Sequence, residues 1–391
     1  MTKPTKILHV IDSLGRRGGA ERQLALEIGM LDRERFTNHI CYLRPPDYLE
    51  PLFRSMDVPV HRLDVFGKRH WISGIYKLRK LVKSLEIDLI HTSLYDSDIV
   101  GGITGKLTGV PVVSTLTSSL YEPEWLVDNP HVNRYKLAFA RLTRAFVARY
   151  CDYHVVAISE SVRKSAMRQL GLHEHKISVI YRAVSPEWLS NGAPPTRGEA
   201  KRPDAVPEGD PVLINTGRLE PPKGQRYIIE AMPQVLRQFP QAVLLIVGEG
   251  SLQPQLAGMA HDLGVQDSVF FLGQRTDVKQ LLEYADIFVF PSLYEGLGNA
   301  LIESMVMGLP SIVSNIPTFI EVSQEGKYGT LVPLRDPQAI AEAVINLASH
   351  PKEAKLLGQR ASEMARHKFV LDEVVNQRSA AYERCLAKVG S

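Results

Sequence analysis

Short apolar runs rich in Val, Ile and Leu alternate with longer amphipathic stretches along the whole chain, and this alternation limits the fold more than any other feature. Such runs are typical of strands buried on both faces, and the amphipathic stretches are typical of covering helices. The pattern predicts an α/β fold with doubly wound parallel sheets. The predicted strands are 6–12, 39–43, 58–65, 88–92, 111–116, 154–158, 177–181, 212–217, 242–248, 269–273, 287–291, 311–314 and 330–332.

The length of 391 residues favours two domains. Segment 190–210 is rich in Pro, Gly and charge and nearly free of large apolar residues, which is typical of a linker or long exposed loop. We therefore expect a Rossmann-like domain over 1–189, this linker, a second Rossmann-like domain over 211–365, and closing helices over 366–391. Open parallel sheets bind ligands at the carboxyl ends of their strands, so two such domains would face an interdomain cleft.

Composition narrows the class of protein. No run approaches the roughly 20 apolar residues of a membrane span, and the N-terminus lacks a signal-peptide pattern, so we expect a cytoplasmic protein. The three cysteines lie far apart without a CxxC pair, which favours reduced thiols over disulfides or zinc. Residues 1–190 carry 27 Lys and Arg against 20 Asp and Glu, and the remainder 19 against 23. The basic half could face phosphates or an anionic membrane, whereas the acidic half and the lack of an aromatic-basic module disfavour nucleic acid.

Two loops that follow predicted strands carry features of phosphate binding. Gly15, Gly18 and Gly19 allow a tight turn before a helix that opens near Ala20, where free N–H groups suit an anion, although the spacing is not GxGxxG. Arg218 and Lys223 lie in the loop after 212–217. Two cations there suit a pyrophosphate leaving group, and a solvated basic loop is the alternative.

The strongest signal is FPSLYEGLGNALIESMVMG at 290–308. A strand ends at Pro291, and a helix begins near Gly298 with Glu295 before it and Glu303 inside it. The open helix start can meet a phosphate or a hydroxyl, and each carboxylate can accept from a vicinal diol. The alternative is a capping Glu and a surface Glu.

These motifs together resemble the retaining GT-B glycosyltransferases, most closely glycosyltransferase family 4. Glu295 and Glu303 match the family's E-x(7)-E motif, Arg218 and Lys223 resemble its R-x(4)-K pair, and Gly18-Gly19 resembles its N-terminal glycine loop. LLIVGEG at 244–250, FLGQ at 271–274 and GTLVP at 329–333 follow in the family's order, so the resemblance spans almost the whole chain.

The resemblance implies a role for each matching residue. Arg218 and Lys223 would bind the donor diphosphate, with Gly19 approaching it from the other domain, and Glu303 would hold the ribose. Glu295 would contact the donor sugar beside the N–H groups of Leu297, Gly298 and Asn299, and the loop that ends at Arg275 would border the base. Anomeric configuration would be retained, with the leaving phosphate taking the acceptor proton and no metal required.

One departure concerns the sugar side of the N-terminal domain. Many relatives place a histidine at the end of the strand that here reads VPVVSTLTSS, where this chain has Thr115, Thr117 and Ser118. Thr117 can hydrogen-bond a sugar hydroxyl but cannot be cationic. His91 is a candidate substitute, with a core or strand-end histidine as the alternative.

Two further signals have competing interpretations. Asp96-Ser97-Asp98 forms a DxD, but its place at a predicted helix start favours capping over metal binding, and no metal is expected. Segment 132–150 is amphipathic and basic, with Tyr135, Phe139, Leu142 and Phe146 at helical spacing. It could lie on an anionic membrane and reach a lipid-linked acceptor, while a packed helix with a solvated basic face is the commoner case.

The sequence therefore predicts a glycosyltransferase that moves a hexose or N-acetylhexosamine from a nucleotide diphosphate sugar, with UDP the expected nucleotide, to a sugar or lipid-linked acceptor in cell-surface polysaccharide or glycoconjugate synthesis. No cofactor beyond this co-substrate is expected. A catalytically silent sugar-nucleotide-binding partner subunit and a nonhydrolysing UDP-sugar epimerase remain alternatives.

Overall fold

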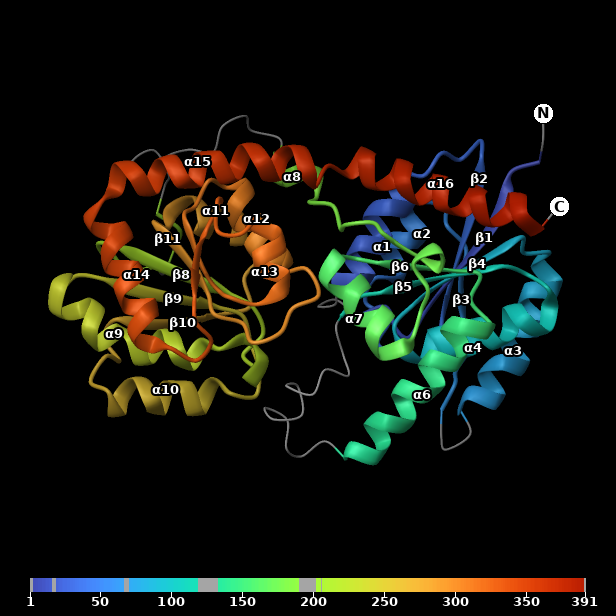
Figure 1. Ribbon diagram of the computed structural model, residues 1–391, viewed down its shortest axis with the longest axis horizontal. Coiled ribbons are helices and arrows are strands. Elements are labelled where there is room, and N and C mark those ends of the chain that lie inside the picture. The colour runs from blue at the N-terminus through green and yellow to red at the C-terminus, as the bar shows by residue number, and fades with distance from the viewer. Residues whose placement is uncertain are drawn as a thin grey trace. The chain divides into compact units, whose positions relative to one another are not determined.

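A computed structural model describes residues 3–15, 19–66, 70–118, 133–189, 202–204 and 206–389. The chain divides into two compact units, unit 1 with residues 1–183 and 371–391, and unit 2 with residues 184–370 (Figure 1). Most of the predicted linker, 190–201 and 205, lies outside the described residues, as does Gly18 of the glycine loop.

Unit 1 contains a seven-stranded sheet with strand order β3-β2-β1-β4-β5-β6-β7, in which neighbouring strands pair in parallel. Its strands are β1 Thr5–Ile11, β2 Phe36–Tyr42, β3 Val60–Arg62, β4 Leu89–Ser93, β5 Val112–Leu116, β6 His154–Ala157 and β7 Ile177–Val179. Its helices are α1 Gly19–Met30, α2 Glu50–Ser55, α3 His70–Leu85, α4 Tyr95–Thr108, α6 Arg134–Tyr150, α7 Glu160–Leu170, a short η1 Glu174–Lys176, and the last helix α16 Leu371–Val389.

Unit 2 contains a six-stranded parallel sheet with order β10-β9-β8-β11-β12-β13. Its strands are β8 Val212–Thr216, β9 Val243–Val247, β10 Val269–Gly273, β11 Ile287–Phe290, β12 Ser311–Ser314 and β13 Thr330–Val332. Its helices are α8 Pro186–Leu189, η2 Pro221–Lys223, α9 Gln225–Gln238, α10 Gln253–Asp262, α11 Val278–Tyr284, α12 Asn299–Val306, α13 Pro317–Val322, α14 Pro337–Ser349 and α15 Pro351–Lys368.

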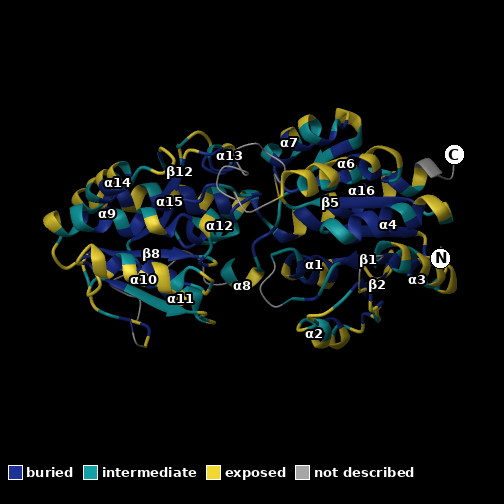
Figure 2. Cartoon of the chain, turned by 90° about the horizontal axis from the view of Figure 1, so that it is seen from below, coloured by how far each residue is buried: buried dark blue, intermediate teal, exposed yellow. Residues whose placement is uncertain are grey.

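The predicted fold class is confirmed, because both units are Rossmann-like and each predicted strand corresponds to one of β1–β13. The central strands of each sheet are buried, edge strands such as β3 and β10 are partly exposed, and the outward sides of the helices are exposed (Figure 2). In unit 1, α1, α2 and α16 pack their apolar side chains on one core cluster, and α3 and α4 pack on another. None of the helices in the described parts of the chain is long and apolar enough to cross a membrane.

A buried ionic cluster joins α4, α6 and the sheet in unit 1. Arg144 lies 3.0 Å from Asp98 and 2.9 Å from Asp152, and it donates to Ser114 at the centre of β5. All three charged side chains are at most 4% exposed. Burial raises the pKa of Asp98 to about 7, although the charge of Arg144 opposes that shift.

This cluster corrects the capping interpretation of Asp96 and Asp98. Asp96 accepts from Trp71 at 2.8 Å and from Arg44, and Asp98 is occupied by Arg144 and by the Thr92 hydroxyl. The start of α4 is instead bound by Asp12, whose carboxylate accepts from the Ser97 N–H at 2.7 Å. Sequence spacing could not reveal these arginines, which come from distant segments.

Replacement of Arg144 by Met is expected to lower the free energy of unfolding by about 3–5 kcal/mol, because two buried carboxylates lose their partner. Arg141→Met, at an exposed position of the same helix, should change it by less than about 0.5 kcal/mol. Urea unfolding followed by circular dichroism measures both, and equal effects would show that the cluster contributes little.

Candidate functional site

The loop after β8 places Lys223 at the carboxyl edge of the unit 2 sheet. Its Nζ lies 2.5 Å from Oε1 of Glu295, which follows β11, and 5.4 Å from the centre of the Phe290 ring. Both charged side chains are largely buried, at 19% and 12% exposure. Two predicted site residues 72 positions apart are thus in direct contact.

Glycines shape this loop. Gly224, directly after Lys223, has φ +68°, and a Cβ on it would lie 2.1 Å from the Pro291 carbonyl oxygen. Gly248 and Gly250, in the loop after β9, are equally restricted, because added Cβ atoms would lie 2.0 and 2.2 Å from the carbonyl oxygens of Gly217 and Leu219. The shape of the loop therefore depends on close backbone approaches that only glycine permits at these positions.

Arg218 is oriented differently from Lys223. It is 60% exposed and donates to Glu220 at 2.8 Å, while its own carbonyl accepts from the buried Gln225 side chain. Within the described residues, Arg218 forms no hydrogen bond or ion pair with Lys223 or Glu295. Of the two predicted cations, Lys223 is thus held by Glu295 and Arg218 faces solvent.

The segment between β11 and α12, together with the first turns of α12, holds the remaining predicted donor-binding groups, which are Glu303 and the backbone of Leu297, Gly298 and Asn299. The Glu295 carbonyl accepts from Thr318 at 2.8 Å, and Gly298 precedes α12 with φ +81° and no side-chain cap. Leu297 is buried, Asn299 opens the helix, and Glu303 lies half-buried one turn further. The first N–H groups of a helix have no partner within it, so this uncapped start can meet an anion.

Buried polar atoms without hydrogen-bond partners gather at the same strand ends. Within the described part of unit 2 they are Asn215 Oδ1, Thr216 Oγ1, Ser292 Oγ, Asn299 Oδ1 and Ser314 Oγ. They lie at or just after the ends of β8, β11 and β12, or at the start of α12. Because buried polar groups nearly always have partners, their concentration here makes this edge of the unit 2 sheet the candidate site for a polar ligand.

Arg275 lies at the other side of the sheet, after the edge strand β10. Its guanidinium binds Asp277 through two hydrogen bonds of 2.8 and 2.6 Å, and the Asp277 carboxylate raises the pKa of Arg275. In the sheet order, β9 lies between β10, which Arg275 follows, and β8, which the Lys223 loop follows.

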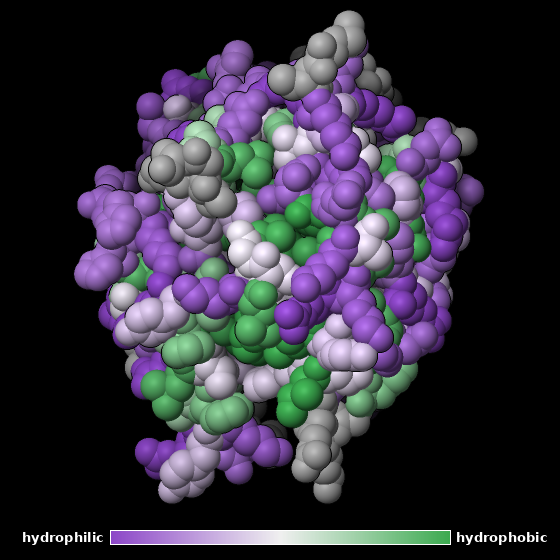
Figure 3. All heavy atoms as spheres, turned by 90° about the vertical axis from the view of Figure 1, so that its right-hand side faces the viewer, coloured by the Kyte–Doolittle hydropathy of each residue, from purple (hydrophilic) through white to green (hydrophobic). Residues whose placement is uncertain are grey.

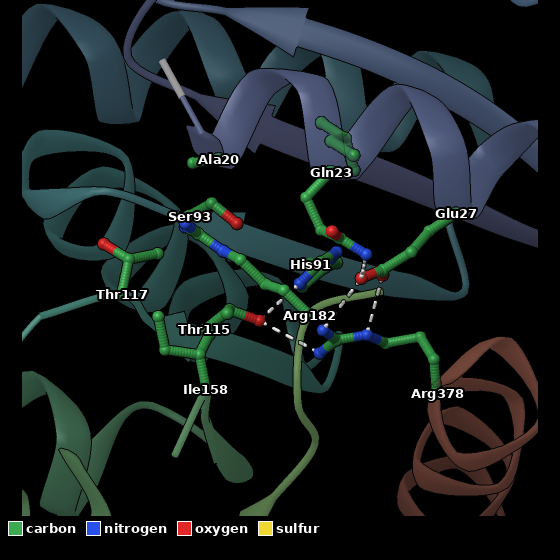
Figure 4. Close-up of a pocket in the computed structure, with 11 residues that line it drawn as sticks. Ala20, Gln23, Glu27, His91, Ser93, Thr115, Thr117, Ile158, Arg182 and Arg378 are labelled. Atoms are coloured by element: carbon green, nitrogen blue, oxygen red, sulfur yellow. Dashed lines mark hydrogen bonds and ion pairs between the residues drawn. The ribbon is translucent and has the colours of Figure 1, made fainter. Parts of the chain in front are cut away.

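Unit 1 has a narrow polar pocket at the carboxyl ends of its central strands (Figure 4). Gly19 is the first residue of α1, whose next residue, Ala20, lines this pocket. Thr117 lines it half-buried, whereas Ser118 is exposed and does not. The full lining is Ala20, Gln23, Leu24, Glu27, His91, Ser93, Thr115, Thr117, Ile158, Arg182 and Arg378.

His91 lines the pocket as a buried member of a hydrogen-bond network. Its Nε2 lies 2.9 Å from the Thr115 hydroxyl, and its Nδ1 lies 3.0 Å from both His9 Nδ1 and the Tyr382 hydroxyl. Burial, followed by the charge of Arg378, holds the pKa of His91 well below its usual range, so the ring is neutral. It cannot supply the positive charge of the absent family histidine.

Two arginines of this pocket were not identified from the sequence. Arg378, on α16, is buried, binds both carboxylate oxygens of Glu27 at 3.0 and 3.4 Å, and donates to Thr115 at 3.0 Å. Arg182, after β7, extends across the pocket toward Ser93 (Figure 4). In the sequence, Arg378 lies among the apolar residues Val374, Val375 and Tyr382, which was a signal that its side chain is buried. No sequence spacing indicates that it reaches Glu27 of α1.

Comparisons with known proteins agree with this geometry. Residues 17–188 match the family model "Glycosyltransferase Family 4", and residues 196–364 match "Glycosyl transferases group 1". The fold and the two matches define a GT-B glycosyltransferase. The chain belongs to the family 4 type of these enzymes, as its motifs predicted.

Individual relatives cover nearly the whole chain. An Escherichia coli enzyme, UDP-Gal:alpha-D-GlcNAc-diphosphoundecaprenol alpha-1,3-galactosyltransferase, is 29% identical over 88% of this chain and 87% of its own length. An uncharacterized glycosyltransferase of Methanocaldococcus jannaschii is 24% identical over 85% and 86%. Anabaena HepE, solved with UDP and glucose, superposes with a TM-score of 0.76 at 23% identity, over 97% of this chain and 100% of HepE, and supports the fold.

Gly224 has a left-handed backbone, and a Cβ added there would lie 2.1 Å from the Pro291 carbonyl oxygen. Gly224→Ala should therefore displace the Lys223 loop and lower the free energy of unfolding by more than about 1 kcal/mol. Gly258→Ala is the matched control, since its added Cβ meets nothing within 4 Å on α10 and should be neutral or stabilising. Thermal unfolding compares the two, and an unaltered Gly224→Ala protein would contradict the described loop.

Proposed function

We propose that this glycosyltransferase moves a hexose or N-acetylhexosamine from a UDP-sugar to an acceptor hydroxyl with retention of anomeric configuration. The observation that carries the proposal is the Lys223–Glu295 pair at the sheet edge of unit 2, surrounded by buried polar atoms without partners. The HepE structures with UDP, and the UDP-galactose donor in the name of the E. coli relative, support UDP as the nucleotide.

The donor site in this proposal uses the groups described above. Lys223 and the exposed Arg218 neutralise the leaving diphosphate together with the uncapped start of α12, so the proposal needs no metal ion. Glu303 accepts from the ribose hydroxyls, and Arg275 borders the base. Glu295 accepts from the donor sugar, beside the N–H groups of Leu297, Gly298 and Asn299.

Lys223 exchanges partners when the donor binds. In the structure Lys223 donates to Glu295, and a diphosphate would offer more negative charge at the same place. Transfer of Lys223 toward the diphosphate frees Glu295 for the sugar hydroxyls. The pair thus keeps both charges compensated before binding, which avoids an isolated buried charge.

The transfer step follows a front-face course. The acceptor oxygen bonds to the anomeric carbon on the face from which the diphosphate leaves, while the bond between that carbon and the phosphate oxygen breaks. The acceptor proton passes to the departing phosphate oxygen, so no protein base is required. Lys223 and Arg218 lower the barrier because negative charge on the diphosphate grows as the bond breaks.

The acceptor binds, in this proposal, at the carboxyl edge of the unit 1 sheet. Thr117, Ser118 and the pocket residues Arg182 and Glu27 offer donors and acceptors to sugar hydroxyls, while buried His91 positions Thr115. The name of the E. coli relative gives a lipid-linked saccharide as its acceptor. We propose the same class here, for a cytoplasmic enzyme peripheral to the membrane in cell-surface glycoconjugate synthesis.

The purified protein is expected to gain thermal stability from UDP-sugars but not from GDP- or ADP-sugars, by about 2.7 kcal/mol at 100 times the dissociation constant. It should also hydrolyse its donor slowly without acceptor, which a silent binding subunit would not do. Stabilisation without any hydrolysis or transfer would contradict the enzyme assignment.

Lys223→Ala and Glu303→Ala should each weaken UDP-sugar binding by about 10- to 150-fold, the equivalent of about 1.5–3 kcal/mol for a charged hydrogen bond. Glu295→Ala should mainly lower kcat. Lys352→Ala, an exposed residue of α15, serves as the control. Calorimetric titration and steady-state kinetics separate the effects, and unchanged donor affinity in the first two variants would refute the site.

A further inference from the structure

The apolar side chains of α6 lie on the surface of unit 1. Tyr135, Phe139, Leu142, Phe146 and Tyr150 are between 56% and 79% exposed and repeat every three or four residues, so they form one stripe along the helix. The opposite face of α6 is buried through Arg144, Ala145, Val147 and Ala148. Within the described residues, α6 packs through this opposite face and not through the apolar stripe, so the packed-helix interpretation is wrong for the stripe.

A second set of exposed apolar side chains lies on α3 and just before it, and one ring contact joins α3 to the α6 stripe. Phe66, Ile72 and Tyr76 are at least 60% exposed, and Trp71 stacks on Phe139 with ring centroids 6.3 Å apart and planes 9° from parallel. On the side of the molecule where α3 lies, hydrophobic atoms gather at the centre and in the lower half, with hydrophilic atoms around them (Figure 3). We name Phe66, Ile72, Tyr76 and the α6 stripe the α3/α6 surface.

The charged side chains on α3 and α6 themselves are all cationic, although Asp96 at the start of α4 accepts from Trp71. Helices α3 and α6 together contain nine Lys and Arg and no Asp or Glu. Of these, only Arg144 is buried, and Lys80 lies with its Nζ 4.5 Å from the centre of the exposed Tyr76 ring. Aromatic and aliphatic side chains beside solvent-facing cations suit the headgroup region of an anionic bilayer.

We infer that the α3/α6 surface docks on a membrane that contains anionic lipid. The biological setting of this docking rests on the proposed function. The docking surface adds to that function the residues that contact the membrane. Apolar burial supplies part of the affinity, and each cation near the surface adds about 1 kcal/mol. A second copy of this chain is the weaker occupant, because two such surfaces would bring their cations together.

Vesicle co-sedimentation of the full chain tests the inference. The wild type should bind phosphatidylglycerol–phosphatidylcholine vesicles at low salt, and bind pure phosphatidylcholine vesicles much less. Leu142→Ser/Phe146→Ser and, separately, Arg134→Gln/Lys136→Gln should each reduce binding by about tenfold or more. Leu263→Ser/Leu356→Ser is the matched control, since it replaces two exposed leucines of unit 2 and should leave binding unchanged.

Three results would overturn the inference: no binding to anionic vesicles at low salt, equal loss in the control variant, or a dimer that Leu142→Ser/Phe146→Ser converts to a monomer. Circular dichroism confirms that each variant is folded. Donor hydrolysis without vesicles should be the same in all variants. A variant that loses vesicle binding but still hydrolyses the donor would bear on the docking surface alone. If no variant, including the wild type, hydrolyses the donor, the result would instead count against the proposed donor chemistry.

Discussion

Parallel strands bring their carboxyl ends to one edge of a sheet, and the candidate donor site depends on this constraint. The loop after β8 and the segment after β11 meet there, so that Lys223 reaches Glu295 at 2.5 Å across 72 positions of sequence. Gly224, Gly248 and Gly250 permit the close backbone approaches that hold the loop. The result is a compensated charge pair beside buried polar atoms that have no partner within the described chain.

The sheet architecture could be predicted because buried parallel strands leave a local signal. Runs such as VLLIV at β9 are apolar on both faces, so strand positions and the fold class follow from the sequence. The site motifs could also be identified from the sequence, because they directly follow these strands. The resemblance to family 4 then added roles that no spacing supplies, and those roles remain proposals.

Long-range contacts could not be predicted. Asp98 was interpreted as a helix cap because its partner, Arg144, lies 46 positions later and cannot be identified from the local sequence. In the same way, Arg378 binds Glu27 from the opposite end of the chain. The α6 stripe shows a different failure. Its periodicity is the same for a buried and for an exposed face, so only the structure shows that its apolar side is uncovered.

Unit 2 thus carries the candidate donor site, and unit 1 carries the proposed membrane-docking surface. The central claim is that the Lys223–Glu295 pair is the resting form of a diphosphate-sugar site. A crystal structure of the chain with UDP bound tests it most directly. The account predicts that Lys223 Nζ leaves Glu295 and lies within hydrogen-bonding distance of a phosphate oxygen. A UDP molecule bound elsewhere, with the Lys223–Glu295 pair intact, would contradict it.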